Sequence, residues 1–107
     1  MKSIETYVLL IPVENVDARK ICEVTQELPI EWEDDMLNCV NSITAKIRKR
    51  IQSEINSLHI TVDSFYVYSM NDFMESCNDD ELDLGDYFIG YVQVHKTERP
   101  HHVWWKH

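Results

Sequence analysis

The strongest chemical signal in the sequence is a run of carboxylates between residues 71 and 87. The run contains no Lys or Arg, and its acidic residues are Asp72, Glu75, Asp79, Asp80, Glu81, Asp83 and Asp86. A string of carboxylates can take the place of backbone phosphates in the Lys- and Arg-lined groove of a nucleic-acid-binding protein. The run therefore indicates a binding surface for a basic protein. The alternative is a solvated loop that keeps the protein soluble and protects a sheet edge.

Further residues extend the predicted partner-binding surface. A second acidic patch is formed by Glu31, Glu33, Asp34 and Asp35. Aromatic side chains anchor many protein interfaces, and the candidates for that role are Tyr87, Phe73 and Trp32. Because salt screens attraction between exposed charges, we expect the affinity for the partner to fall steeply as salt rises.

Two other uses of these carboxylates fit the sequence poorly. A calcium-binding loop needs oxygen ligands at its first, third and fifth positions and Gly at its sixth. Counted back from Gly85, Asp80 takes the first position, but Leu82 and Leu84 take the third and fifth. A glycosidase needs two carboxylates at a set separation on rigid elements, and a loop is a poor scaffold for such a pair. We expect neither a metal site nor a catalytic pair in this run.

Histidine and cysteine offer only weak catalytic signals. His59 and Asp63 share one face of a predicted strand, with His95 on another, which resembles a His–Asp acid–base pair in outline. No nucleophile motif accompanies them, so a hydrogen-bonded structural pair is favoured. The histidines and cysteines lack the paired spacing of zinc ligands, and two glycines cannot build a glycine-rich phosphate loop. We therefore predict a protein without catalytic residues, metal or cofactor.

Composition narrows the class of protein. The chain has 107 residues, 44% of them hydrophobic, with a formal net charge of −9, which is typical of one small acidic domain. No apolar run approaches the ~20 residues that span a bilayer, and residues 1–6 do not read as a signal peptide. Three scattered cysteines, Cys22, Cys39 and Cys77, are typical of free thiols in a reducing compartment. We expect a cytoplasmic protein with no membrane partner.

Charge is distributed unevenly along the chain. Acids dominate residues 1–35 and 71–107, whereas a basic band lies between them, formed by Lys46, Arg48, Lys49 and Arg50. The acidic field repels phosphate backbones, so direct nucleic-acid binding is disfavoured outside this band. The simplest interpretation of the band is a solvated helix face.

The pattern of apolar residues predicts the elements that position these groups. The run within residues 5–14 is apolar on both alternating faces, as in a central strand, and Pro12 should end it. Asn15 can cap a following helix, which Pro29 closes. Apolar steps of three and four from Met36 to Leu58 predict a long amphipathic helix, capped by Asp34 or Asp35. Residues 59–69 and 87–96 are predicted to form strands, the first with a bulge at Asp63–Ser64. Residues 71–76 are predicted to form a short helix.

This order predicts an α+β fold. We expect a three-stranded sheet with two helices packed on one face, in the order β-α-α-β-β, with the acidic run connecting the last two strands. The helical crossover permits parallel pairing of the first two strands, and the last two would pair antiparallel. Residues 1–96 would form a single domain, followed by a His- and Trp-rich tail at 97–107 that contains His101, His102, Trp104 and Trp105.

The other face of this sheet has no evident cover. The side chains expected on it are Tyr66, Tyr68, Tyr87 and Tyr91. An aromatic surface of this kind is typical of a homodimer interface; the alternative is that the Trp104–Trp105 tail folds back over it.

The function predicted from these observations is that of a small, acidic, non-enzymatic binding protein whose partner is a basic protein surface. In size, charge and lack of catalytic motifs the chain is similar to small acidic proteins that bacteriophages encode to bind and block host factors. That resemblance implies a viral inhibitor of a nucleic-acid-binding protein. The alternative is a homodimeric structural or scaffold protein.

Overall fold

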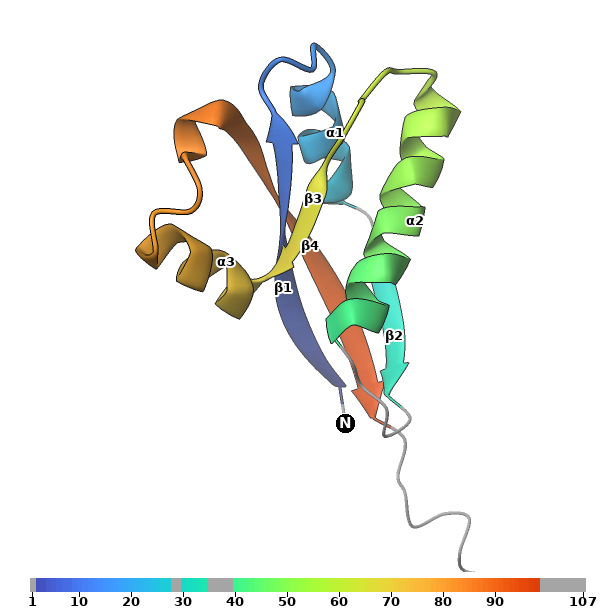
Figure 1. The fold of residues 1–107 in the computed structure, drawn as a ribbon. Helices are drawn as coiled ribbons and strands as arrows, with labels where there is room; N and C mark the ends of the chain where they lie inside the picture. Colours follow the sequence, from blue (N-terminus) through green and yellow to red (C-terminus); the bar gives the residue numbers. More distant parts are fainter. Residues whose placement is uncertain (1, 28–29, 35–39, 99–107) are drawn as a thin grey trace, which may run out of the picture.

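The protein folds around one mixed sheet that separates two groups of helices (Figure 1). The computed structural model describes residues 2–27, 30–34 and 40–98. Its strands are β1 (Lys2–Pro12), β2 (Ile30–Asp34), β3 (Tyr66–Ser69) and β4 (Tyr87–Glu98), in the sheet order β2-β4-β1-β3. Its helices are α1 (Ala18–Thr25), α2 (Val40–Leu58), α3 (Met70–Asn78) and the single 3₁₀ turn η1 (Leu84–Asp86). In Figure 1, α1 and α2 lie on one side of the sheet, and α3 and η1 on the other.

Strand β1 is the centre of the fold, as its two-sided apolar pattern predicts. It pairs antiparallel with β4 on one side and with β3 on the other. Tyr7, Leu9 and Ile11 belong to the core beneath the helices, whereas Val8 and Leu10 point to the opposite face. All of them are at most 1% exposed. Pro12, which lacks a backbone N–H, is the last residue of the strand.

The helical side of the core confirms the predicted apolar stripe of α2. Its isoleucines at steps of four, Ile43, Ile47, Ile51 and Ile55, are buried against the sheet. Ala18, Ile21 and Cys22 fill the space below α1. Helix α1 approaches β4 closely because Gly90 has no side chain: a Cβ there would lie 3.3 Å from the Cys22 Sγ.

The predicted three-stranded sheet is wrong, because Ile30–Asp34 forms a fourth strand, parallel to β4. Ile30 and Trp32 face the helical core while Glu31 faces away, which is the alternation of a short edge strand. The acidic residues of this segment had indicated a helix cap instead. Residues 35–39, where the cap was expected, lie outside the described residues, as do Pro29 and the segment that contains Trp104 and Trp105.

The predicted strand pairing is also wrong. β1 is antiparallel to both of its neighbours, and β3 and β4 do not touch because β1 lies between them. The physical reason is that β1 is apolar on both faces and therefore takes a central position. The acidic connection from β3 to β4 consequently passes over β1 rather than closing a hairpin.

The starts of α1 and β3 differ from the prediction for a shared reason. Asn15 does not cap α1, which begins at Ala18, and residues 60–65 form neither a helix nor part of the sheet. The Asn15 Oδ1 accepts the backbone N–H of Asp63 at 3.0 Å, and the Asp17 Oδ2 accepts that of Thr61 at 3.2 Å. These side chains bind backbone groups that a strand would have paired, so the ladder begins only at Tyr66 and the predicted bulge at Asp63–Ser64 is absent.

Candidate partner-binding surface

The first half of the acidic run is displayed on helix α3, which has well-formed ends. The Ser69 Oγ accepts the backbone N–H of Asp72 at 3.2 Å and caps the first turn. At the other end, the backbone N–H of Asp80 donates to the Cys77 carbonyl and that of Glu81 to the Ser76 carbonyl, at 3.3 and 2.9 Å. This pair of bonds is a Schellman motif, and it requires the left-handed conformation that Asp80 adopts at φ 56°. The acidic residues are therefore held on an ordered element.

The second half of the run is tied to the end of β1. The Asp83 Oδ1 accepts the backbone N–H of Gly85 at 3.0 Å, which caps η1. The carbonyl of Asp86 accepts the backbone N–H of Val13 at 2.9 Å. The loop between α3 and β4 is thus anchored at both ends.

All seven carboxylates of the run are exposed, and none forms an ion pair with a described residue. The ion pairs that the described residues form are Arg50 with Glu54, at 3.8 Å, and Lys96 with Glu5, at 2.6 Å. Asp79, Asp80 and Glu81 lie beyond the C-terminal end of α3, where the helix dipole is negative and disfavours further negative charge. The local fold therefore gains no electrostatic stabilisation from these three side chains.

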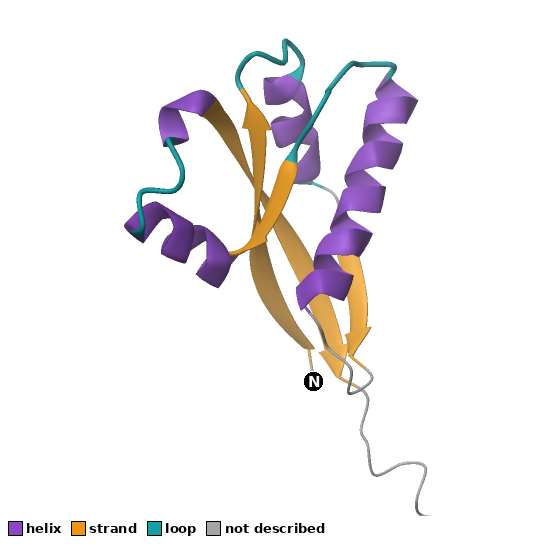
Figure 2. Ribbon diagram, in the orientation of Figure 1, coloured by secondary structure: helices purple, strands orange, loops and turns teal. Residues whose placement is uncertain are grey.

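Two loops and the turn η1 lie at the upper end of the molecule in Figure 2, and the loops add acids that sequence reasoning did not assign to the binding surface. Glu14 and Asp17 come from the loop after β1, and Asp63 from the segment after α2. Bonds already described join these loops: Val13 to Asp86, Asn15 to Asp63 and Asp17 to Thr61. We call this end the acidic pole, formed by Glu14, Asp17, Asp63, Asp83 and Asp86. Only tertiary hydrogen bonds unite its parts, so no local sequence pattern could have revealed it.

The predicted aromatic anchors are divided between two places. Tyr87 lies at the acidic pole, where its ring meets that of Tyr66 edge to face, with centroids 6.2 Å apart. Phe73 is half-buried on α3, within the acidic run. Trp32 packs against the helical core on β2, at the opposite edge of the sheet. Glu31 lies on that edge too, so the second acidic patch is not continuous with the first.

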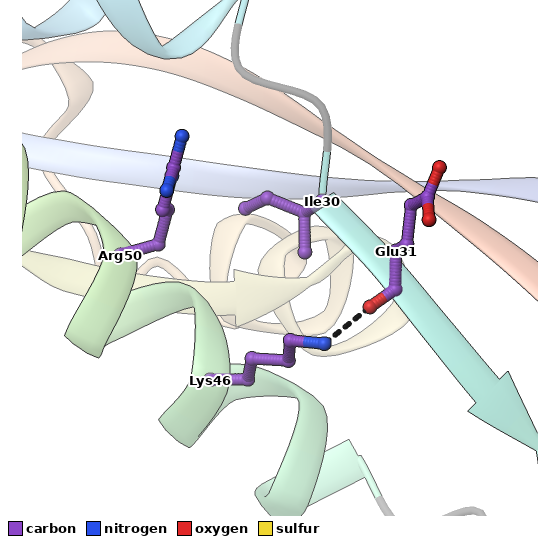
Figure 3. A pocket seen from close by; sticks show the side chains of 4 residues that line it. All are labelled: Ile30, Glu31, Lys46 and Arg50. Carbon is purple, nitrogen blue, oxygen red and sulfur yellow. Dashed lines mark hydrogen bonds between the residues drawn. The ribbon is translucent and has the colours of Figure 1, made fainter.

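The basic band of α2 lies beside β2, away from the acidic run (Figures 1 and 3). Lys46 donates a hydrogen bond to the Glu31 carbonyl, and its Nζ lies 5.6 Å from the centre of the Trp32 ring. Lys46 and Glu31, with Arg50 and Ile30, line an open hollow of about 280 Å³. Arg48 and Lys49 are exposed. Lys46 thus joins α2 to β2, and the basic band lies beside Glu31 rather than beside the acidic run.

The predicted aromatic face exists, but it is not wholly uncovered. The register places Tyr66 and Tyr68 opposite Leu10 and Val8, and places Tyr87, Ile89 and Tyr91 opposite Pro12, Leu10 and Val8. Residues paired in this way share one face of a sheet. Val8 and Leu10 are fully buried in the floor of this face, whereas Tyr66 and Tyr91 remain 42% and 46% exposed.

The residues considered for acid–base chemistry are not brought together. His59 follows α2 in a left-handed conformation, at φ 55°, and Asp63 lies at the acidic pole. His95 lies eight residues along β4 from Tyr87, which corresponds to about 26 Å of strand. Among the described residues, no three His, Cys, Asp or Glu side chains are placed to hold a metal ion.

The cysteines differ in environment. Cys22 is buried below α1, and burial, together with the charge of Glu23, raises the pKa of its thiol to about 11. Cys77 is half-buried on α3, and Cys39 lies outside the described residues. The Cys22 thiol is therefore protonated at neutral pH and serves as a core residue.

Comparison with family models, with curated proteins and with solved structures found no match for this chain. None of the described helices has the length and apolar character needed to cross a membrane.

Proposed function

We propose that the protein is a non-enzymatic binding module whose acidic run docks on a basic surface of a partner protein. The observation that carries this proposal is that all seven carboxylates from Asp72 to Asp86 are exposed and unpaired with any described cation. A partner that supplies Lys and Arg side chains would neutralise them, and the field of the run would steer its approach.

The arrangement on α3 supports a partner that normally binds a phosphate backbone. Asp72 and Glu75 are three residues apart on α3, so they share one face of the helix, and Asp79 follows four residues later as the C-cap. The remaining carboxylates continue from the end of that face along the loop to η1. A row of charges on an ordered element suits the groove of a nucleic-acid-binding protein, which the bound module would inhibit.

The test compares two variants with equal loss of charge. Asp79→Asn/Asp80→Asn removes two carboxylates of the run and retains side chains that tolerate the left-handed position. Glu23→Gln/Glu27→Gln removes two exposed carboxylates on and after α1. A partner recovered from lysate is identified, purified and titrated with each variant by calorimetry at two salt concentrations.

We expect the first variant to bind roughly two- to thirtyfold more weakly, since each exposed ion pair contributes about 0.2–1 kcal/mol. The second variant should bind as the unmodified protein does. Affinity should also fall as salt rises. A partner whose binding is indifferent both to salt and to the Asp79/Asp80 change would refute the proposal.

The second candidate function is that of a homodimer, favoured by the exposed Tyr66 and Tyr91 on the face opposite α1 and α2. Sedimentation at high concentration would show a dimer, and Tyr91→Asp should dissociate it. Val16→Asp is the matched control, because Val16 is 91% exposed in the loop after β1. A monomer at all concentrations would exclude this candidate.

A further inference from the structure

A hollow of about 440 Å³ lies at the acidic pole, between the end of β1, the segment before β3 and the start of β4. The residues that give it chemical character are Val13, Glu14, Ser64, Tyr66, Asp86 and Tyr87. Its volume is within the range of about 300–1,000 Å³ that is typical of ligand clefts. The hollow brings together residues from three parts of the chain.

The lining combines two carboxylates with two aromatic rings. Glu14 and Asp86 are exposed, and none of the described residues that line the hollow carries a positive charge. Tyr66 and Tyr87 meet edge to face at an interplanar angle of 83°, so the two rings form a corner. Arg19, at the start of α1, lies over the Phe88 ring at 5.6 Å; Phe88 belongs to the helical side of the sheet, so Arg19 does not fill the hollow.

We propose that this hollow binds the guanidinium group of an arginine side chain of the partner protein. Guanidinium is planar, stacks on aromatic faces and donates paired hydrogen bonds to carboxylates, and the hollow offers both kinds of contact. An ammonium group lacks the plane and the paired donors, so lysine fits less well. The proposal rests on the proposed function, because the arginine would belong to the partner's basic surface.

The walls of the hollow are held in place before any ligand arrives. Val13 donates its backbone N–H to the Asp86 carbonyl at 2.9 Å, which joins the wall that carries Glu14 to the wall that carries Asp86. Asn15, which is 7% exposed, donates to the Pro12 carbonyl at 3.1 Å and accepts from Asp63 at 3.0 Å. Asp63 directly precedes Ser64, so the bond from the Asp63 N–H to Asn15 holds the part of the lining that contains Ser64. A site built in advance loses little conformational entropy on binding.

The probe is N-acetyl-arginine amide, titrated into the ¹⁵N-labelled full chain and followed by amide chemical shifts. We expect saturable shifts at Val13, Glu14, Ser64, Asp86 and Tyr87, with a millimolar Kd. N-acetyl-lysine amide should bind at least threefold more weakly. N-acetyl-citrulline amide, which has the same shape without the charge, should cause no saturable shift.

A Glu14 variant distinguishes this site from the acidic run, because Glu14 lines the hollow but lies outside residues 71–87. Glu14→Gln should weaken arginine binding at least threefold, and Tyr66→Leu should weaken it as well. Glu27→Gln, an exposed acid after α1, should leave it unchanged. An unaltered spectrum elsewhere would show that each variant is folded.

Equal shifts with citrulline, or arginine affinity unchanged in Glu14→Gln, would overturn the assignment of this hollow. Shifts confined to residues 72–83 would also overturn it, yet would leave the proposed function standing, since the acidic run would still attract cations. The proposed function fails separately, if the Asp79→Asn/Asp80→Asn variant binds the purified partner without loss.

Discussion

The side chain of Asn15 joins two parts of the chain that are 48 residues apart, because its Oδ1 accepts the backbone N–H of Asp63 at 3.0 Å. Its Nδ2 donates to the Pro12 carbonyl at 3.1 Å, so one buried amide connects the end of β1 to the segment that leads into β3. Buried polar groups of this kind are costly to leave unpaired. The position of the acidic pole therefore depends on a residue that carries no charge.

Replacing Asn15 tests this dependence. Asn15→Ala should lower the free energy of unfolding by about 1–3 kcal/mol, because the Asp63 N–H loses its partner and the Pro12 carbonyl keeps only the backbone N–H of residue 15. Urea denaturation measures the change. Ser64→Ala, an exposed substitution in the same region, should stay within about 0.5 kcal/mol. Equal stability of the two variants would show that the Asn15 bonds do not hold the pole.

Gly90 should tolerate no side chain without a rearrangement of α1. A Cβ at Gly90 would lie 3.3 Å from both Cβ and Sγ of Cys22, so Gly90→Ala should destabilise the fold by about 1–3 kcal/mol. Combining it with Cys22→Ala should recover part of that loss in a double-mutant cycle measured by urea denaturation. Gly85→Ala is the control, since its Cβ would approach only the Asp83 Oδ1, on a flexible side chain at 3.3 Å. Additive effects at Gly90 and Cys22 would contradict the predicted contact.

The free energy of unfolding should fall at alkaline pH because Tyr7 loses its proton. Burial, followed by the charge and hydrogen bond of Glu5, raises the pKa of Tyr7 to about 12 from its ordinary value of 10.0. The unfolded chain therefore loses this proton at a lower pH than the folded protein does, and the free energy of unfolding declines between pH 10 and 12. Tyr7→Phe should show a flatter decline over that interval in urea titrations. Parallel pH curves for the two proteins would contradict the assignment.

Asp80 should affect stability and partner binding in opposite directions. Its φ of 56° is a conformation that glycine adopts without strain, so Asp80→Gly should stabilise the fold by roughly 0.5–1 kcal/mol. The same change removes a carboxylate of the acidic run and should weaken binding of the partner. Asp80→Asn isolates the loss of charge, because Asn also tolerates this conformation. Thermal unfolding and calorimetry provide the two measurements, and a glycine variant that is less stable would refute the argument from backbone strain.

Periodicity was sufficient to predict the parts of the fold that bury the most apolar surface. Ile43, Ile47, Ile51 and Ile55 of α2 lie where steps of four place them, and β1 is buried on both faces as its continuous apolar run requires. The shared face of Tyr66, Tyr68, Tyr87 and Tyr91 also follows from the alternation of side chains along each strand.

Strand pairing and the acidic pole could not be predicted in the same way. Strand β2 has five residues, three of them acidic. Its alternation of apolar and acidic residues is too short to indicate a strand, so on sequence alone the acidic residues are interpreted as a helix cap. The pole forms through bonds between residues more than 40 positions apart, such as Asp17 to Thr61. Such bonds leave no local pattern, and the contribution of Glu14 to the hollow becomes visible only in the folded chain.

The pairing of β1 with β4 has a consequence for how the chain is made. β4 is the last described element to be synthesised, yet it provides the whole length of one side of β1 and the only described partner of β2. Until residues 87–98 leave the ribosome, β1 keeps an unpaired apolar edge and β2 has no strand to join. The nascent chain therefore stays exposed to proteases and to aggregation until β4 has been made. A chain that stops before β4 should be degraded rather than accumulate as a smaller folded domain.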